Sequence, residues 1–227
     1  MIFSDKYKYL GICIPKNGST SIQSVFTPYG QLLSAGPNEH HMTLAEAVRR
    51  FPQTNDYFKF AFVRNPYDRI ISFYHYFSHV RSTLRMPDAY QPGPRYHGHR
   101  DFLKRILSDR LWKDEVHFIP QHTFIDVEQM DFIGRFENFE NDIDHIFTTL
   151  NIPKYEEMAY DRKSNYEGAC DCPYPLKGFF DPETAHIMYD HFKTDFDLFG
   201  YDPSDWETPF HMAQMRAFLS SLPQLGV

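Results

Sequence analysis

Short apolar runs alternate with amphipathic stretches along this chain, which is the pattern of strands alternating with helices. Residues 9–14 (Y-L-G-I-C-I) and 58–63 (F-K-F-A-F-V) are rich in β-branched and aromatic residues, and we expect both to be buried strands. Residues 132–135 read as a further strand that leads into a turn. Each of the first two runs is followed by a polar turn and then by apolar residues at helical spacing. This order predicts an α/β fold with a mainly parallel central sheet flanked by helices.

The later amphipathic stretches predict further helices. Thr43 and Glu46 form a candidate capping box before a helix that buries Leu44 and Ala47. The other expected helices cover residues 142–150, 182–199 and 210–222. Stretches rich in proline, glycine and polar residues predict loops at residues 29–38, 78–98 and 162–178.

A polar turn follows the first predicted strand, which Pro15 ends because proline has no N–H for a ladder. The turn consists of Lys16, Asn17, Gly18, Ser19, Thr20 and Ser21. Gly18 permits a sharp bend, the helix start offers unpaired N–H groups, and Lys16 adds a positive charge, so the turn could hold a phosphate. Its spacing differs from the triphosphate-binding loop, in which the lysine follows the second glycine. The alternative interpretation is a turn capped by serine or threonine, with a solvated lysine.

A second polar turn follows the strand at residues 58–63. Arg64 stands at the strand end, Asn65 is a candidate N-cap, and Pro66 occupies the first helical position. Asp68 and Ser72 follow one and two turns along the helix, on the side that faces back toward Arg64. Arg64 and Ser72 could together hold a second phosphate. The alternative is a surface Arg64–Asp68 pair beside a solvated serine.

These two motifs, P-K-N-G-S-T-S and R-N-P-Y-D-R-I-I-S-F-Y, resemble the cofactor signatures of the sulfotransferases that use 3′-phosphoadenosine 5′-phosphosulfate (PAPS). G-R-F-E-N at residues 134–138 and D-F-x-x-F-G-Y at residues 195–201 resemble later landmarks of the carbohydrate-type (heparan- and chondroitin-like) enzymes. The resemblance implies one sulfotransferase domain over residues 1–227, with a three-layer, P-loop-like fold.

The resemblance also implies roles for individual residues. Lys16, Asn17, Gly18, Ser19, Thr20 and Ser21 correspond to the loop that binds the 5′-phosphosulfate of PAPS. Arg64 and Ser72 correspond to the 3′-phosphate site, and Lys16 would also neutralise the leaving oxygen. His41 matches the catalytic base of heparan-type relatives, with His40 as a second choice and His117, in an H-x-x-P-Q segment, as a third. Arg162, Lys163 and Ser164 are weaker matches to a late loop over the 3′-phosphate.

Composition limits the other possibilities. A chain of 227 residues suits one domain, and a net charge of −7 argues against a general nucleic-acid binder. Cys13 is expected as a buried thiol, while Cys170 and Cys172 stand too close together for an unstrained disulfide and lack further ligands at zinc-site spacing. We therefore expect no metal and no disulfide. Residues 81–113 carry an excess of five positive charges, which suits either an anionic acceptor or a solvated helix face.

The first ten residues lack a signal-peptide pattern, and no run is long and apolar enough for a transmembrane helix, so we expect a cytoplasmic protein. The expected partner is a hydroxyl-bearing acceptor, with a carbohydrate favoured over a lipid or another small-molecule alcohol. Two other classes remain open: a non-catalytic nucleotide-binding module, and a small-molecule kinase, which the inverted order of Lys16 and Gly18 disfavours.

Overall fold

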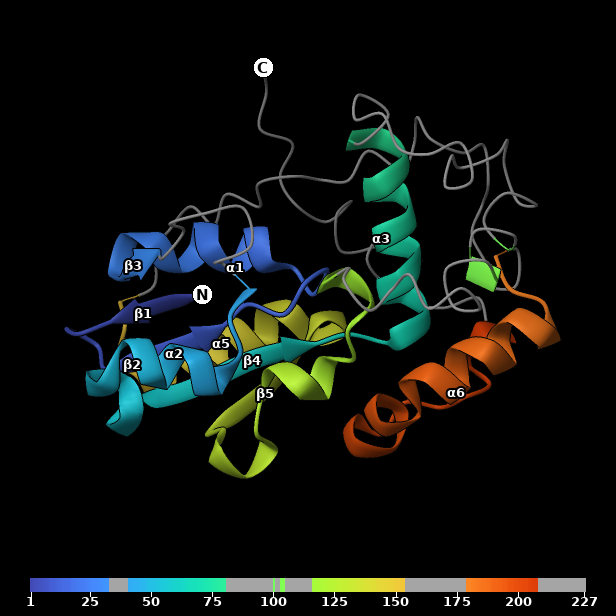
Figure 1. Ribbon diagram of the computed structural model, residues 1–227. Coiled ribbons are helices and arrows are strands. Elements are labelled where there is room, and N and C mark those ends of the chain that lie inside the picture. Colours follow the sequence, from blue (N-terminus) through green and yellow to red (C-terminus); the bar gives the residue numbers. More distant parts are fainter. Residues whose placement is uncertain (33–40, 81–99, 101–102, 105–115, 154–178, 208–227) are drawn as a thin grey trace, which may run out of the picture. The chain divides into compact units, whose positions relative to one another are not determined.

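The computed structural model describes residues 1–32, 41–80, 100, 103–104, 116–153 and 179–207, with no side-chain description for residues 75–80. The chain divides into two units, Met1–Arg64 with Trp112–Tyr166 and Asn65–Leu111 with Glu167–Val227. Figure 1 labels the helices and strands of both units. The expectation of one sulfotransferase domain over the whole chain stays a prediction.

A five-stranded sheet forms the centre of the first unit. Its strands are β1 (Ile2–Ser4), β2 (Tyr9–Ile12), β3 (Gln31–Leu32), β4 (Phe58–Val63) and β5 (Phe132–Arg135), in the order β3-β1-β2-β4-β5. β2, β4 and β5 are parallel neighbours, whereas β1 is antiparallel to both β2 and β3. The predicted mainly parallel sheet is confirmed.

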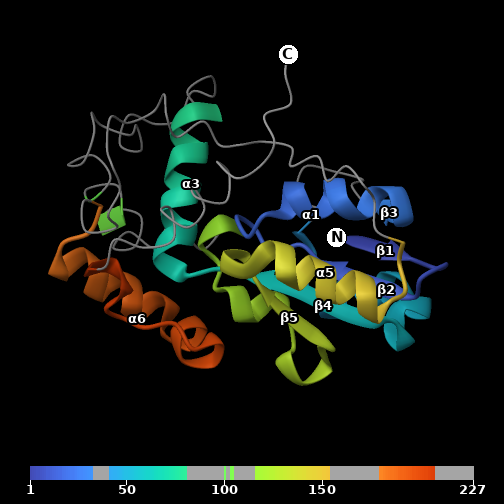
Figure 2. The same cartoon turned by 180° about the vertical axis from the view of Figure 1, so that it is seen from behind.

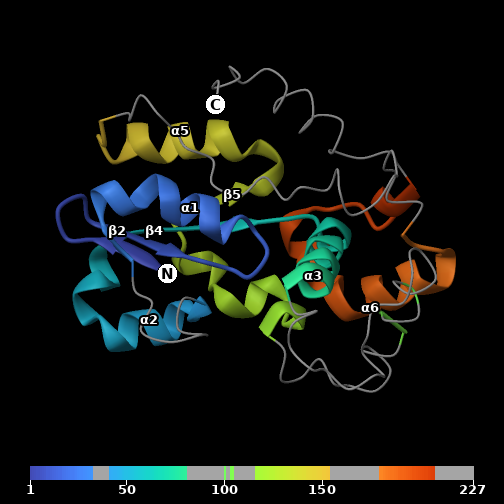
Figure 3. The same cartoon turned by 90° about the horizontal axis from the view of Figure 1, so that it is seen from above.

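Helices cover both faces of this sheet (Figures 2 and 3). α1 (Ser19–Phe26) and α5 (Phe139–Thr149) lie on one face, and α2 (Leu44–Arg50) lies on the other. The predicted capping box of α2 is confirmed, since Thr43 and Glu46 satisfy each other's backbone N–H groups. The expected helix at residues 142–150 corresponds to the larger part of α5. Successive side chains of a strand point to opposite faces of the sheet, so each strand supplies both cores. In β1, Ile2 faces the side of α1 and α5, while Phe3 packs on Phe51 beside α2.

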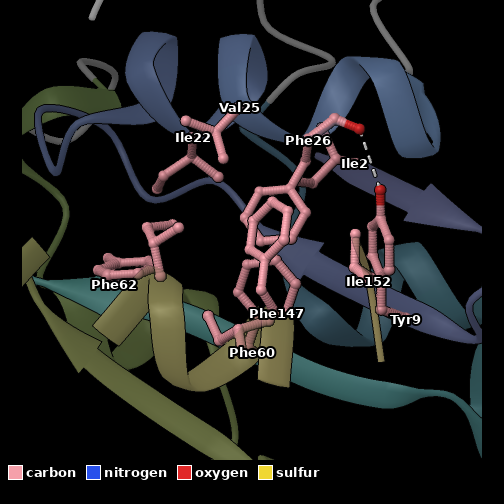
Figure 4. Packing of buried hydrophobic residues seen from close by; sticks show 11 residues of the cluster. Ile2, Tyr9, Ile22, Val25, Phe26, Phe60, Phe62, Phe147 and Ile152 are labelled. Atoms are coloured by element: carbon pink, nitrogen blue, oxygen red, sulfur yellow. Dashed lines mark hydrogen bonds between the residues drawn. The ribbon is translucent and has the colours of Figure 1, made fainter. Parts of the chain in front are cut away.

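Aromatic rings fill the space between the sheet and the helices α1 and α5 (Figure 4). Phe26 of α1 lies 4.9 Å from Phe60 of β4 and 5.2 Å from Phe147 of α5, measured between ring centroids. Tyr9 of β2 packs on the edge of Phe26, and its hydroxyl donates to the Phe26 carbonyl oxygen over 3.1 Å. Truncating one such buried ring to alanine typically costs about 3–5 kcal/mol. This core therefore holds α1, and the loop before it, against the strand ends.

The second unit contains α3 (Pro66–Val80) and α6 (Pro182–Phe199). The predicted N-cap of α3 is confirmed, because the side-chain oxygen of Asn65 accepts from the Tyr67 N–H over 3.0 Å. Tyr67 packs on Phe180 and on Phe196 of α6, with both ring centroids 5.0 Å away. α6 matches its predicted bounds and ends at Gly200, which has a φ of 65°.

Short 3-10 turns join these elements. They are η1 (Thr27–Tyr29), η3 (Pro52–Asp56), η7 (Val116–Phe118), η8 (Gln121–Phe124), η9 (Val127–Gln129), η10 (Phe136–Asn138) and η13 (Asp205–Glu207). None of the described helices has the length and apolar character needed to cross a membrane.

Several expectations lie outside the described residues. These are the helix at residues 210–222, the loop at 162–178 and most of those at 29–38 and 78–98, nearly all of the basic segment 81–113, and His40, Arg162, Lys163, Ser164, Cys170 and Cys172.

Candidate active site

The loop between β2 and α1 turns through two residues in the left-handed conformation. Lys16 has a φ of 67° and Gly18 a φ of 78°, and Gly18 is the N-cap of α1. The hydroxyl of Ser19 donates to the Ile14 carbonyl oxygen over 2.8 Å. The first turn of α1 carries hydroxyl residues and no carboxylate, so none of its own residues neutralises the positive end of the helix dipole. The alternative of a turn capped by serine or threonine is therefore wrong, because glycine occupies the cap position.

The ring of Phe136, in the 3-10 turn that follows β5, packs closely on this loop. A Cβ atom built on Gly18 would lie 2.8 Å from the ring of Phe136, in the turn that follows β5. Real Cβ atoms do not approach other atoms so closely, and a φ of 78° is itself unfavourable for other residues. Glycine is thus required at position 18 for two separate reasons.

Arg64 leaves the end of β4 next to the same loop. Its guanidinium donates to the Lys16 carbonyl oxygen over 3.1 Å and lies 4.3 Å from the ring centroid of Phe136. Only 4% of Arg64 is exposed, and Asp68 is 9% exposed. The alternative of a surface Arg64–Asp68 pair is therefore wrong. The structure brings Lys16, Gly18 and Arg64 together at the carboxyl ends of two parallel strands.

Gln121 links the two strand ends. Its side-chain oxygen accepts from the Arg64 N–H over 2.9 Å and from the Asn17 side-chain amide over 2.6 Å, and its side-chain nitrogen donates to the Arg64 carbonyl oxygen over 2.8 Å. Both amide side chains are fully buried. Sequence reasoning assigned Gln121 no role; its only signal was its place in the H-x-x-P-Q segment.

His41 stands just before α2 and contacts Cys13, the residue that directly follows β2. Its Nδ1 atom lies 2.7 Å from the Cys13 carbonyl oxygen. Because a carbonyl oxygen can only accept, Nδ1 carries the proton in this contact, and a neutral ring then has its lone pair on Nε2. The ring of His117 lies 6.2 Å away, edge to face. Two of the three histidines proposed as bases therefore stand next to each other.

The other predicted site residues have separate places. Thr20 is exposed and Ser21 is partly buried in the first turn of α1. Ser72 is a buried residue of α3 in the second unit, so the solvated serine of the alternative interpretation is wrong. The convergence of Ser72 with Arg64 stays a prediction. Within the described residues, no three histidine, cysteine or acidic side chains gather as a metal site would need.

Comparison with known proteins identifies the family. A model of the sulfotransferase family matches residues 1–202. Searches of curated proteins and of solved structures returned no match. The family match spans both predicted cofactor motifs, the His41 region and all strands of the sheet. The chain belongs to the sulfotransferase family.

Proposed function

We propose that this protein moves a sulfuryl group from PAPS to a hydroxyl of a carbohydrate acceptor. Family membership supports sulfuryl transfer, and the finer statement rests on the loop between β2 and α1. The single observation that carries it is the hydrogen bond from the Arg64 guanidinium to the Lys16 carbonyl oxygen. One doubly phosphorylated nucleotide can reach both predicted anchors only if they share one edge of the sheet, and this contact is what such a site needs.

In this proposal the donor's 5′-phosphate is held by backbone N–H groups from Gly18 to Ser21. A helix start with glycine at the cap and hydroxyl residues in its first turn suits an anion. Asn17, whose side chain is fully buried, supports the loop from within. Arg64 and Ser72 would bind the 3′-phosphate, and a guanidinium can do so through two parallel hydrogen bonds. PAPS would thereby be selected over nucleotides that lack the 3′-phosphate.

The proton and the leaving charge are handled by two further residues. Nε2 of His41 takes the proton of the acceptor hydroxyl as its oxygen bonds to sulfur, and the bond between sulfur and the 5′-phosphate oxygen breaks. Lys16 neutralises the charge that develops on that oxygen. The contact between Nδ1 of His41 and Cys13 supports this assignment, because it leaves the lone pair on the outer nitrogen. His117, whose ring lies beside His41, is the second candidate.

Two finer points belong to the same proposal. The parallel strands β2, β4 and β5, with helices on both faces, support a three-layer, P-loop-like arrangement. The carbohydrate acceptor rests on the resemblance of residues 134–138 and 195–201 to carbohydrate-type enzymes. A lipid or another small-molecule alcohol is the alternative acceptor.

The test combines turnover with binding. Incubation with PAPS that carries radiolabelled sulfur and a panel of oligosaccharides, sterols and phenols should label an oligosaccharide. Calorimetry should show tighter binding of 3′-phosphoadenosine 5′-phosphate than of adenosine 5′-phosphate. Labelling of a sterol or phenol would support sulfuryl transfer but contradict the carbohydrate acceptor. Binding without turnover on any acceptor would favour the non-catalytic module, and Mg²⁺-dependent ATP binding would favour the kinase.

A further inference from the structure

The side-chain amide of Gln121 pairs with the backbone of Arg64 in the way that a neighbouring strand would. β4 ends at Val63, and the next residue, Arg64, offers one N–H and one carbonyl group that no longer belong to the sheet ladder. The Gln121 amide pairs with both groups, over 2.9 Å and 2.8 Å, from the start of the 3-10 turn η8. Buried backbone groups need such partners, and here they are supplied by a residue 57 positions away.

The chemistry of these groups determines which way the amide points. The Arg64 N–H can only donate and the Arg64 carbonyl can only accept, so the oxygen of Gln121 must face the former and its nitrogen the latter. That oxygen then accepts a second bond, from the Asn17 side-chain nitrogen. The same nitrogen donates to the Phe62 carbonyl oxygen over 2.8 Å.

Asn17 depends on this link. Its side-chain oxygen is buried and has no hydrogen-bond partner among the described residues, so the bonds to Phe62 and Gln121 orient its amide. Asn17 lies between Lys16 and Gly18, the two left-handed residues of the loop. Gln121 is therefore the only side chain in these contacts that is bonded to the loop and to Arg64 at once.

We infer that Gln121 is a positioning residue that sets the distance between Arg64 and the loop that joins β2 to α1. The inference rests on the proposed function, in which the loop and Arg64 bind the two phosphates of one nucleotide. Gln121 touches neither phosphate; it is hydrogen-bonded to Arg64 and, through Asn17, to the loop that precedes the N–H groups of α1. A misplacement of about 1 Å can lower a rate roughly 100-fold, so a buried amide at this junction can control both affinity and turnover.

The experiment measures nucleotide selectivity and not stability alone. Gln121→Glu keeps the size and the accepting oxygen but loses the donor to the Arg64 carbonyl. We expect the preference for 3′-phosphoadenosine 5′-phosphate over adenosine 5′-phosphate, measured by calorimetry, to fall about tenfold, which is the loss expected when one hydrogen bond to a charged group is displaced. Gln53→Glu makes the same change on an exposed 3-10 turn and should leave the preference unchanged.

The outcomes separate this inference from the proposed function. A wild-type protein that binds both nucleotides equally overturns both proposals. A wild type that prefers the 3′-phosphate, together with a Gln121→Glu variant of equal preference, overturns only the role of Gln121. If Gln121→Glu does not fold, Gln121→Met tests the same point with a side chain of similar length that has no amide. A lower melting temperature with unchanged selectivity would mean that Gln121 is merely structural.

Discussion

The guanidinium of Arg64 lies over the ring of Phe136, 4.3 Å from its centroid, so the second predicted anchor rests on an aromatic side chain from the turn that follows β5. The same ring closes the space beside Gly18. One side chain thus supports Arg64 on one side and shapes the loop on the other. A cation on an aromatic face gains about 1–2 kcal/mol when both are shielded from water.

Replacing Phe136 should therefore weaken donor binding. We expect Phe136→Leu to raise the dissociation constant of 3′-phosphoadenosine 5′-phosphate about 5- to 30-fold, which corresponds to a loss of about 1–2 kcal/mol. Phe136→Trp should retain more of the affinity, because its ring attracts cations more strongly. Phe132→Leu, at the start of β5 and packed on His145, serves as the control in calorimetry. Equal losses in Phe136→Leu and Phe132→Leu would contradict the role of the Arg64 contact.

A methyl group at position 18 should damage the loop twice. Gly18→Ala must adopt a φ of 78° and place its Cβ 2.8 Å from Phe136, so we expect a loss of stability of about 1–3 kcal/mol together with weaker donor binding. Gly200→Ala carries similar backbone strain at the end of α6, where φ is 65°. Thermal unfolding and calorimetry should show both variants destabilised, but only Gly18→Ala with reduced nucleotide affinity. Normal affinity in Gly18→Ala would exclude the loop as the phosphate site.

Removing the charge of Lys16 should slow the reaction itself. Lys16→Met keeps the aliphatic stem and is expected to lower turnover about 10²- to 10³-fold, since one preorganised charge contact to the leaving oxygen is lost. Lys8→Met is a matched control, because Lys8 also has a positive φ, of 55°, and lies over the ring of Tyr57. Single-turnover assays with the labelled sulfur donor provide the measurement. Wild-type turnover in Lys16→Met would refute its catalytic role.

The two neighbouring histidines can be distinguished by substitution and pH. His41→Asn keeps a donor near the Cys13 carbonyl oxygen but removes the outer nitrogen, and we expect turnover to fall about 10²- to 10⁴-fold. In the wild type, the rate should decline as pH drops through the range in which imidazoles take up a proton, because a protonated ring cannot act as a base. The variant should lose this acidic limb. A larger loss in His117→Gln than in His41→Asn would transfer the role to His117.

The capping box of α2 provides a test of stability with a worked-out pH dependence. The backbone hydrogen bond from Thr43 is the main reason why the pKa of Glu46 lies below its ordinary value of 4.5. A lowered pKa in the folded state stabilises the protein above pH 4.5, and this contribution disappears as pH falls through the folded-state pKa.

Thr43→Ala removes the hydroxyl that accepts from the Glu46 N–H and donates to the Glu46 carboxylate, but it keeps the backbone N–H that lowers the Glu46 pKa most. It should lower the free energy of unfolding by about 1 kcal/mol at pH 7, and by somewhat less as pH falls below 4.5, where the hydroxyl no longer faces a charged carboxylate. Thr148→Ala is the control, since the Thr148 hydroxyl only donates to the Asp144 carbonyl oxygen on the exposed surface of α5. Urea denaturation at pH 7 and below pH 4.5 measures the free energy of unfolding of each variant. Equal effects of the two substitutions at pH 7 would show that the box contributes nothing.

The elements with a pattern of their own could be predicted from the sequence. The buried strands β2 and β4 are apolar runs, and α6 is a long amphipathic stretch. β1 and β3 were missed, and β3 lies inside a predicted loop. These strands have only three and two residues, and they exist because β1 pairs with β2 on one side and with β3 on the other. So short a strand has no periodicity that the sequence could reveal.

For the candidate site, local sequence was enough to nominate Lys16, Gly18 and Arg64, because a strand end followed by a polar turn and a helix start is a local feature. Their mutual contact follows from the parallel pairing of β2 with β4. The partners that hold them, Gln121 and Phe136, come from 3-10 turns far along the chain. Only folding brings Gln121 next to Asn17, which is 104 positions away. Hydrogen bonds and ring contacts depend on distance in space, and local sequence patterns do not reveal that distance for residues so far apart in the chain.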